Sequence, residues 1–249
     1  MVTKEIRPIQ GVLFDTTHRD AIAELLRGPA GHTLPVWKVE RVELAERGLI
    51  TITGLYYANG DIFQYSGSST RADKLAMALK CALALQEFHV LGAIHGNVKP
   101  ENFLVTDNGE VHISDVQLNL FLRQLERDLI DNTAIPGSSV YKPHEEVILQ
   151  TATGPIPSST AGDVAAFAGV VYKLMIGRAP MPSGPCGLAR RCFELRQNGN
   201  DLGLIHQHSS LDGDLWQLLM DCWSDPVTRP SMQQVVARLR VIAESGSTA

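Results

Sequence analysis

A short stretch at residues 95–115 carries side chains that could do chemistry together. Apolar residues alternate on either side of an Asp-Asn-Gly turn in this stretch, a pattern that predicts a β-hairpin. Lys99, Asn102 and Asp115 would then gather at one end of the two short strands, which is how a catalytic loop is built. Asn97 lies beside them, and its amide could position a hydroxyl group but could not take up a proton near neutral pH.

The stretch resembles the catalytic loop and metal-binding loop of the protein kinase family, His-Arg-Asp-x-Lys-Pro-Glu-Asn followed by Asp-Phe-Gly. The chain reads His-Gly-Asn-Val-Lys-Pro-Glu-Asn at residues 95–102 and Asp-Val-Gln at residues 115–117. The resemblance implies that Asn102 and Asp115 hold a metal ion and that Lys99 is the lysine of the catalytic loop.

Two residues of this loop depart from the family pattern. Gly96 stands where the family has Arg, and Asn97 stands where it has the catalytic Asp. General base assistance is typically worth about 100- to 10,000-fold in rate, so its loss would take a modest kinase close to background turnover. We therefore expect no catalytic residue in the degenerate loop, which comprises His95, Gly96, Asn97 and Lys99.

His95 can be interpreted in two ways. A histidine next to a flexible glycine could act as a general base. In the family, by contrast, the histidine at this position packs inward as part of the regulatory spine, and we favour this core position for His95.

The first part of the chain predicts the elements of a small, sheet-rich lobe. Residues 2–6 read as a strand, and residues 15–27 read as an amphipathic helix. Apolar and polar residues then alternate at residues 36–44 and 49–55, which predicts a hairpin.

Lys4 and Glu24 are the charged residues of interest in this part. The resemblance places Lys4 where a strand lysine contacts the α- and β-phosphates of ATP, and Glu24 where a helix glutamate pairs with that lysine. A solvated lysine and an exposed helix charge explain the same two residues. No Gly-x-Gly-x-x-Gly sequence precedes Lys4 or occurs elsewhere in the chain, so the backbone cradle that covers the phosphates in kinases is missing.

Residues 56–65 resemble the kinase hinge and the start of the next helix, which places the lobe boundary near Tyr57. Backbone groups at the hinge bind adenine in the family, and Leu104 matches the residue beneath the adenine ring. A plain connector and an ordinary buried strand are the alternatives. Tyr57 and Leu104, together with Lys4 and Lys99, form the nucleotide-binding set that the resemblance implies.

The rest of the chain predicts a mainly helical lobe. Residues 71–90 form a long segment of high helix propensity, and residues 161–174 look like the central helix of the large kinase lobe. Three further amphipathic helices are predicted at residues 188–197, 214–222 and 232–244.

Three charged residues match structural positions of the family. Residues 137–145 are similar to the end of the activation segment, and Glu145 is expected to form a buried ion pair with Arg229. Asp163 matches the residue that holds the catalytic loop; capping of its own helix is the alternative, and one residue can do both. The Cys-Trp and Arg-Pro-Ser sequences near Arg229 favour the tyrosine kinase and tyrosine kinase-like branches.

The composition is that of an ordinary globular protein. The 249 residues are 44% hydrophobic and 20% charged, and the net charge of −5 gives no general attraction to nucleic acid. Four cysteines without metal-ligand spacing are expected to be small buried hydrophobes in a reducing compartment. No signal peptide and no apolar run of about 18 residues is apparent, so we expect a cytoplasmic protein without a membrane span.

These observations predict one α+β domain at residues 1–249 with a two-lobed protein kinase-like fold. A truncated small lobe would occupy residues 1–57, and a mainly helical large lobe would occupy residues 58–249. The domain is interpreted as a pseudokinase, a signalling scaffold or allosteric regulator that binds proteins, with an active kinase, a receptor segment or a scaffold as candidate partner. It would require no cofactor, although ATP with magnesium could bind weakly.

Two alternatives remain. One is a weak or unconventional ATP-dependent kinase for Ser/Thr or Tyr, which would use substrate-assisted proton transfer while Asp115 holds the metal. The other is a fragment of a longer chain, whose preceding strands would supply the Gly-rich loop.

Overall fold

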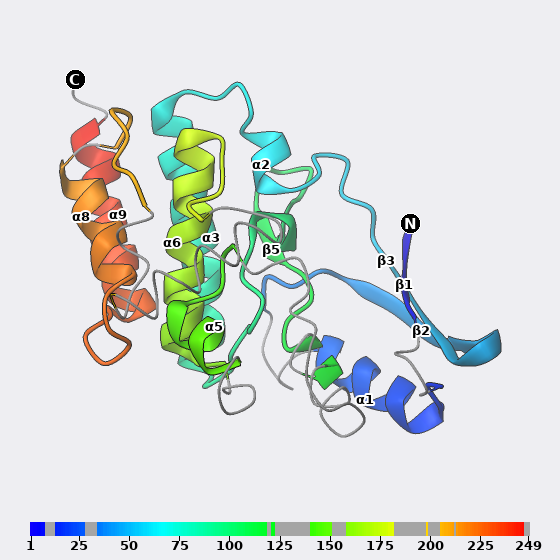
Figure 1. Ribbon diagram of the computed structural model, residues 1–249. Coiled ribbons are helices and arrows are strands. Elements are labelled where there is room, and N and C mark those ends of the chain that lie inside the picture. The colour runs from blue at the N-terminus through cyan, green and yellow to red at the C-terminus, as the bar shows by residue number, and fades with distance from the viewer. Residues whose placement is uncertain are drawn as a thin grey trace.

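The computed structural model consists of a small lobe built on a β-sheet and a larger, mainly helical lobe (Figure 1). It describes residues 1–7, 13–27, 34–118, 121–122, 140–150, 158–181, 198, 205–211 and 213–246. This architecture confirms the predicted α+β, two-lobed fold. The predicted helix at residues 188–197 and the first residues of the predicted activation-segment end, 137–139, lie outside the described residues.

The sheet of the small lobe has three antiparallel strands in the order β1-β3-β2. Its strands are β1 (Val2–Ile6), β2 (Val39–Ala45) and β3 (Leu49–Gly54), and the short 3₁₀ turn η1 (Glu46–Gly48) joins the last two. Alternate residues of β3 are buried, which is the period expected of a strand with one face on a core.

The helix α1 (Thr16–Arg27) covers the core of this sheet. It buries Ile22 and Leu26, and these pack with Ile50 and Ile52 of β3 in the hydrophobic cluster of the small lobe. Two apolar residues four apart on a helix lie on the same face, so one face of α1 is buried and the other is exposed.

The helical lobe is arranged around α6 (Thr160–Ile176), nearly all of whose residues are buried. Ser159 begins this helix by accepting a hydrogen bond from the backbone N–H of Gly162 at 3.0 Å, and Gly177 ends it with a φ of 85°. The long helix α3 (Arg71–Val90) begins at a capping box between Thr70 and Asp73.

The other elements of this lobe are shorter. They are α2 (Ile62–Tyr65), the 3₁₀ turn η2 (Pro100–Asn102), β4 (Phe103–Val105), β5 (Val111–Ile113), α5 (His144–Gln150), α8 (Gly213–Cys222) and α9 (Met232–Gly246). Figure 1 shows α8 and α9 on the side of α6 and α3 that faces away from the small lobe. None of the described helices is long and apolar enough to cross a lipid bilayer.

One predicted strand begins later than its pattern suggested. Residues 36–38 precede β2, and Val36 instead forms an isolated parallel bridge with Ile113 of the helical lobe. The Trp37 N–H donates to the Ile113 carbonyl at 2.8 Å, and the Ile113 N–H donates to the Pro35 carbonyl at 2.6 Å. A contact between the lobes therefore displaces the start of the strand.

Candidate functional site

The hairpin of β4 and β5 brings Asn102 and Asp115 to the same end of two strands. Phe103 lies opposite Ile113 in the antiparallel register, and the Ser114 N–H donates to the Asn102 carbonyl at 2.9 Å. Asn102 and Asp115 flank this backbone pairing directly, as the predicted hairpin implied.

The amide of Asn102 is committed to the backbone of the catalytic loop. Its Nδ2 donates to the carbonyl of Asn97 at 2.9 Å, and both residues are buried. Lys99 is half-buried at the start of η2, and its carbonyl accepts from the Asn102 N–H at 3.0 Å. The loop thus has a defined shape, with an amide at position 97 where a proton acceptor would be needed.

Asp163 holds the loop from the first turn of α6. Its carboxylate accepts hydrogen bonds from the backbone N–H groups of His95 at 2.7 Å and Gly96 at 2.9 Å. Nε2 of His89, at the end of α3, lies 3.1 Å from the same carboxylate. Ser159, not Asp163, caps α6, so contact with the loop describes Asp163 better than capping does. His89 was not predicted as a site residue, and its only signal in the sequence is its place just before the loop.

His95 is fully buried in the described structure. Burial lowers the pKa of its imidazole below the usual value, although the Asp163 and Asp115 carboxylates act in the opposite direction. Nδ1 accepts from the Asn97 N–H at 3.2 Å, and Nε2 has no hydrogen-bond partner among the described residues. His95 is thus a histidine of the core, without contact with solvent.

Lys4 forms an ion pair with Asp115 across the two lobes. Their side chains are 41% and 11% exposed, respectively. Glu24 is exposed on α1, so the pairing of Lys4 with Glu24 that the resemblance implied is wrong and the alternative of an exposed helix charge holds.

In this arrangement Lys4 and Asp115 do not offer their charges to a metal-bound nucleotide, because they are paired with each other. Phosphate binds cations and magnesium binds oxygen ligands, and the charges of Lys4 and Asp115 are here used on each other.

The hinge region makes two contacts that were not predicted from the sequence. The Tyr57 hydroxyl lies 2.7 Å from Nδ1 of His112, which is the cross-strand partner of Leu104 in the hairpin. The Trp37 indole N–H donates to the Leu55 carbonyl at 2.9 Å, and its ring fills the space beside Gly54. Neither Trp37 nor His112 belongs to a recognisable motif, and a glycine at the end of a buried strand is the only signal for the indole.

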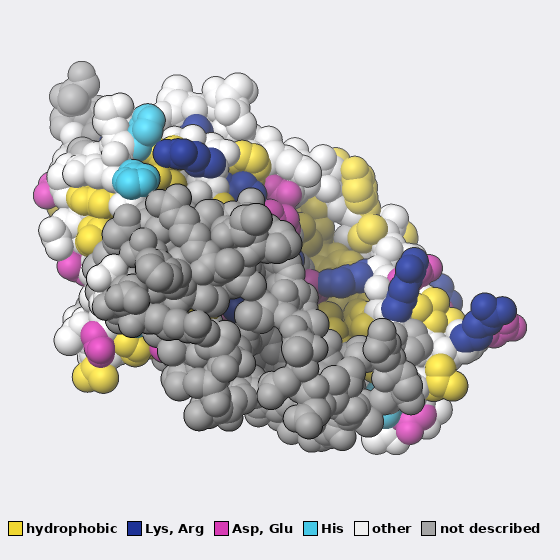
Figure 2. All heavy atoms as spheres, viewed as in Figure 1, with side chains coloured by type: hydrophobic (Ala, Val, Ile, Leu, Met, Phe, Trp, Pro, Cys, Tyr) yellow, Lys and Arg dark blue, Asp and Glu magenta, His cyan; other side chains and the backbone are white. Residues whose placement is uncertain are grey.

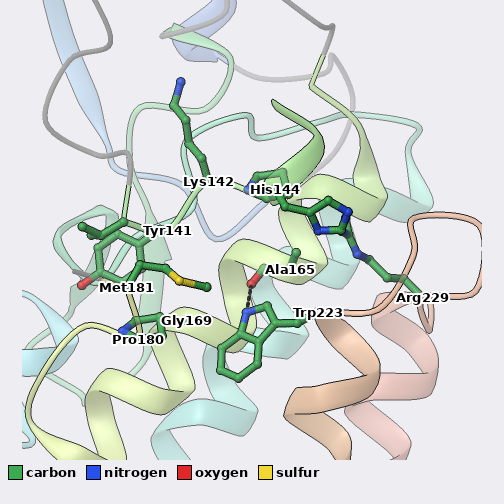
Figure 3. A pocket seen from close by; sticks show the side chains of 11 residues that line it. Tyr141, Lys142, His144, Ala165, Gly169, Pro180, Met181, Trp223 and Arg229 are labelled. Atoms are coloured by element: carbon green, nitrogen blue, oxygen red, sulfur yellow. Dashed lines mark hydrogen bonds between the residues drawn. The ribbon is translucent and has the colours of Figure 1, made fainter. Parts of the chain in front are cut away.

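Glu145 and Arg229 form a two-pronged ion pair. The two guanidinium nitrogens donate to the two carboxylate oxygens at 2.5 and 2.8 Å, and the Arg229 side chain is 1% exposed. Arg229 also donates to the carbonyls of Ala161 at 3.1 Å and Ser224 at 3.0 Å. Figure 3 shows Trp223, whose indole N–H donates to the Ala165 carbonyl at 3.1 Å, in the same region of the lobe. The pair therefore ties α5 to the turn between α8 and α9.

Cys81 and Cys222 are free and buried. Burial raises the pKa of both thiols, to about 12 for Cys222, so neither is a reactive thiolate near neutral pH. The other two cysteines lie outside the described residues.

Comparison with known proteins agrees with the two-lobed kinase-like fold. Residues 50–239 match the family model "Protein kinase domain". A protein kinase and PP2C-like domain-containing protein of Oryza sativa subsp. japonica is 22% identical over 243 residues, which cover 83% of this chain and 37% of that protein. Kinase suppressor of Ras B of Caenorhabditis elegans is 28% identical over 182 residues, covering 66% of this chain and 32% of that protein.

A third relative is the L-type lectin-domain containing receptor kinase VI.2 of Arabidopsis thaliana. It is 33% identical over 154 residues, covering 59% of this chain and 21% of that protein. The chain therefore spans well under half the length of these curated relatives. With most of its length matched by the family model and a two-lobed α+β fold, this chain belongs to the protein kinase family.

Proposed function

We propose that the chain is a pseudokinase domain, a signalling scaffold or allosteric regulator that binds proteins and transfers little or no phosphate. The observation that carries this proposal is Asn97. The loop around it is held by Asp163 and Asn102 with the hydrogen bonds of a rigid scaffold, yet the side chain at the position of the proton acceptor is an amide. The hydrogen bonds that fix the loop are present and its general base is absent. This combination is expected of a domain whose conformation, rather than its catalysis, is used.

Glu146 is the carboxylate to be considered as a substitute base, because it lines a small cavity together with Gly96 and Asn97. It is buried, and its Oε1 lies 3.1 Å from the position that a Cβ on Gly162 would occupy. This carboxylate therefore packs against the first turn of α6, where a partial positive charge stabilises it. We assign Glu146 to the structure of the lobe rather than to proton transfer.

The proposed role requires no cofactor. Lys4, Tyr57, Lys99 and Leu104 remain the candidate nucleotide-binding residues, with Asn102 and Asp115 as candidate metal ligands. ATP with magnesium would bind weakly at most, because Lys4 and Asp115 are paired with each other. We place the lobe boundary near Tyr57, which gives lobes at residues 1–57 and 58–249.

The proposed partner is a protein, with an active kinase as the first candidate. One relative of this chain is named a kinase suppressor of Ras, which supports a role in signalling. The net charge of −5 argues against nucleic acid as a partner. A cytoplasmic location and membership of the tyrosine kinase or tyrosine kinase-like branch complete the proposal.

The second candidate function is a weak, unconventional kinase, which the retention of Lys99, Asn102 and Asp115 favours. Measuring ATP turnover with magnesium or manganese in the wild type and in Asp115→Ala separates the two. We expect equal, background rates in both proteins. Wild-type turnover that Asp115→Ala abolishes would remove the pseudokinase proposal. If Glu146→Gln also abolished the wild-type turnover, Glu146 would be the substitute base.

A further inference from the structure

We propose that Lys4, Asp115 and Leu118 form a clasp between the lobes that occupies the position of metal-bound ATP, so that clasp and nucleotide exclude each other. Lys4 lies in the middle of β1, opposite Ile52 of β3, and Asp115 follows β5 of the helical lobe. The inference rests on the proposed function, because the clasp uses two groups that an active kinase would offer to its nucleotide.

The ion pair joins elements that are far apart in the chain. The carboxylate of Asp115 is mostly buried, while part of the Lys4 side chain stays exposed. Lys4 compensates the charge of the Asp115 carboxylate, whose desolvation alone would be costly. A phosphate group would therefore compete with Asp115 for Lys4, and a magnesium ion would compete with Lys4 for Asp115.

Leu118 extends the clasp into the small lobe. It is 2% exposed and packs with Ile22, Ile50 and Ile52, in the core cluster of the sheet and α1. Phe121 and Leu122 pack against the same cluster. The segment that leaves the hairpin of the helical lobe thus places its first large apolar side chain in the core of the other lobe.

The turn between Asp115 and Leu118 is held in an unusual backbone conformation. Asp115 and Gln117 have φ values of 61° and 56°, in the left-handed region that residues other than glycine seldom adopt. The Gln117 N–H donates to the His95 carbonyl at 3.1 Å, and the Leu118 N–H donates to the Asp115 carbonyl at 3.3 Å. Such a conformation persists when its surroundings hold it, and here they hold it from the catalytic loop and from the small lobe.

A second connection between the lobes does not depend on the ion pair. The backbone of Trp37 is hydrogen-bonded to Ile113, and the Trp37 indole is hydrogen-bonded to the Leu55 carbonyl next to the hinge. Figure 2 shows that hydrophobic side chains line the hollow beside the small lobe on the face in view. The described lobes are thus joined by backbone hydrogen bonds as well as by the ion pair of Lys4 and Asp115.

The first experiment measures nucleotide binding with a fluorescent ATP analogue. We expect the wild type to show no saturable binding, with or without magnesium, up to a nucleotide concentration of about 1 mM, at which even a weak specific site would be half occupied. Saturable binding by the wild type below that concentration would overturn the clasp. If such binding came without turnover, the proposed function would stand and only this inference would fail.

The second experiment maps hydrogen exchange in Lys4→Met, Asp115→Asn and the double variant. Faster exchange is expected on both sides of the clasp, at residues 2–6 and 49–54 and at residues 111–118, and the double variant should resemble the single ones because all three lose the same contact. The matched control is Lys80→Met, which breaks a 2.9 Å ion pair with Glu110 inside the helical lobe. It should leave exchange in the small lobe unchanged. Faster exchange confined to the small lobe in Lys4→Met, or additive effects in the double variant, would overturn the proposal.

Discussion

At the scale of single residues, the burial of a charged side chain determines how much its ion pair affects the free energy of unfolding. The ion pair of Glu145 and Arg229 is two-pronged, with the Arg229 side chain buried and that of Glu145 18% exposed, and Arg229 also donates to two backbone carbonyls. Removing one partner of a buried pair leaves the other charge uncompensated. Arg229→Met is therefore expected to lower the free energy of unfolding by about 3–5 kcal/mol, measured by urea denaturation.

The chain offers a matched control for this variant. Arg238 pairs with Asp221 at 2.6 Å, but both side chains are 38% exposed. Arg238→Met should therefore cost less than about 1 kcal/mol. Equal losses in the two variants would contradict the assignment of Glu145 and Arg229 as a buried structural pair.

His95 gives the fold a dependence on pH. Because burial lowers the pKa of His95 in the folded protein, protons bind more readily to this residue in the unfolded chain. Its contribution to stability is fully present above a pH of about 6.5 and is lost as the pH falls toward the lowered folded pKa.

The measurement is the free energy of unfolding as a function of pH in wild type and His95→Gln. The variant should show a shallower fall in stability below neutral pH, whatever its stability at neutral pH. His208→Gln, which changes an exposed histidine, is the control for the substitution itself. An unchanged slope in His95→Gln would show that His95 does not titrate between the two states.

At the scale of elements, the indole of Trp37 limits the size of the side chain that fits at Gly54, the last residue of β3. A Cβ on Gly54 would lie 2.6 Å from an atom of that ring and 2.7 Å from the Lys38 carbonyl oxygen. Gly54→Ala should therefore destabilise the fold by about 1–3 kcal/mol through overpacking, measured as the free energy of unfolding.

Gly67→Ala is the control for this prediction. A Cβ at Gly67 would meet its nearest neighbours at 3.6 and 3.9 Å, which is ordinary van der Waals contact. That variant should be unchanged or more stable by up to about 1 kcal/mol. If Gly54→Ala behaved in the same way, the indole would not fill the space beside the strand.

Local patterns predicted most of these elements. The periodicity at residues 71–90 predicted α3 to the residue, and the Asp-Asn-Gly turn predicted the hairpin of β4 and β5. The start of β2 was wrong because Val36 pairs with Ile113 of the other lobe, and no local pattern carries information on such a contact. The cap of α6 is Ser159, which the interpretation of Asp163 as a cap overlooked.

At the scale of the whole molecule, the order of motifs along the chain predicted a two-lobed fold but not every pairing between the lobes. Lys4 lies on a strand of one lobe and Asp115 beyond a strand of the other, so their ion pair depends on how the lobes meet. The same holds for Trp37 and His112, which belong to no motif. The residue type at position 97 indicates the missing proton acceptor. The partners of Lys4 and Asp115 could not be predicted in this way, because they depend on how the two lobes meet.

The most direct measurement for the absence of catalysis is a single-turnover experiment with protein in excess over ATP labelled in its γ-phosphate. Excess protein compensates for weak binding, so the labelled phosphate reports the chemical step itself. The account predicts that neither water nor protein receives labelled phosphate faster in the wild type than in Asp115→Ala. Faster transfer in the wild type, lost in Asp115→Ala, would contradict it.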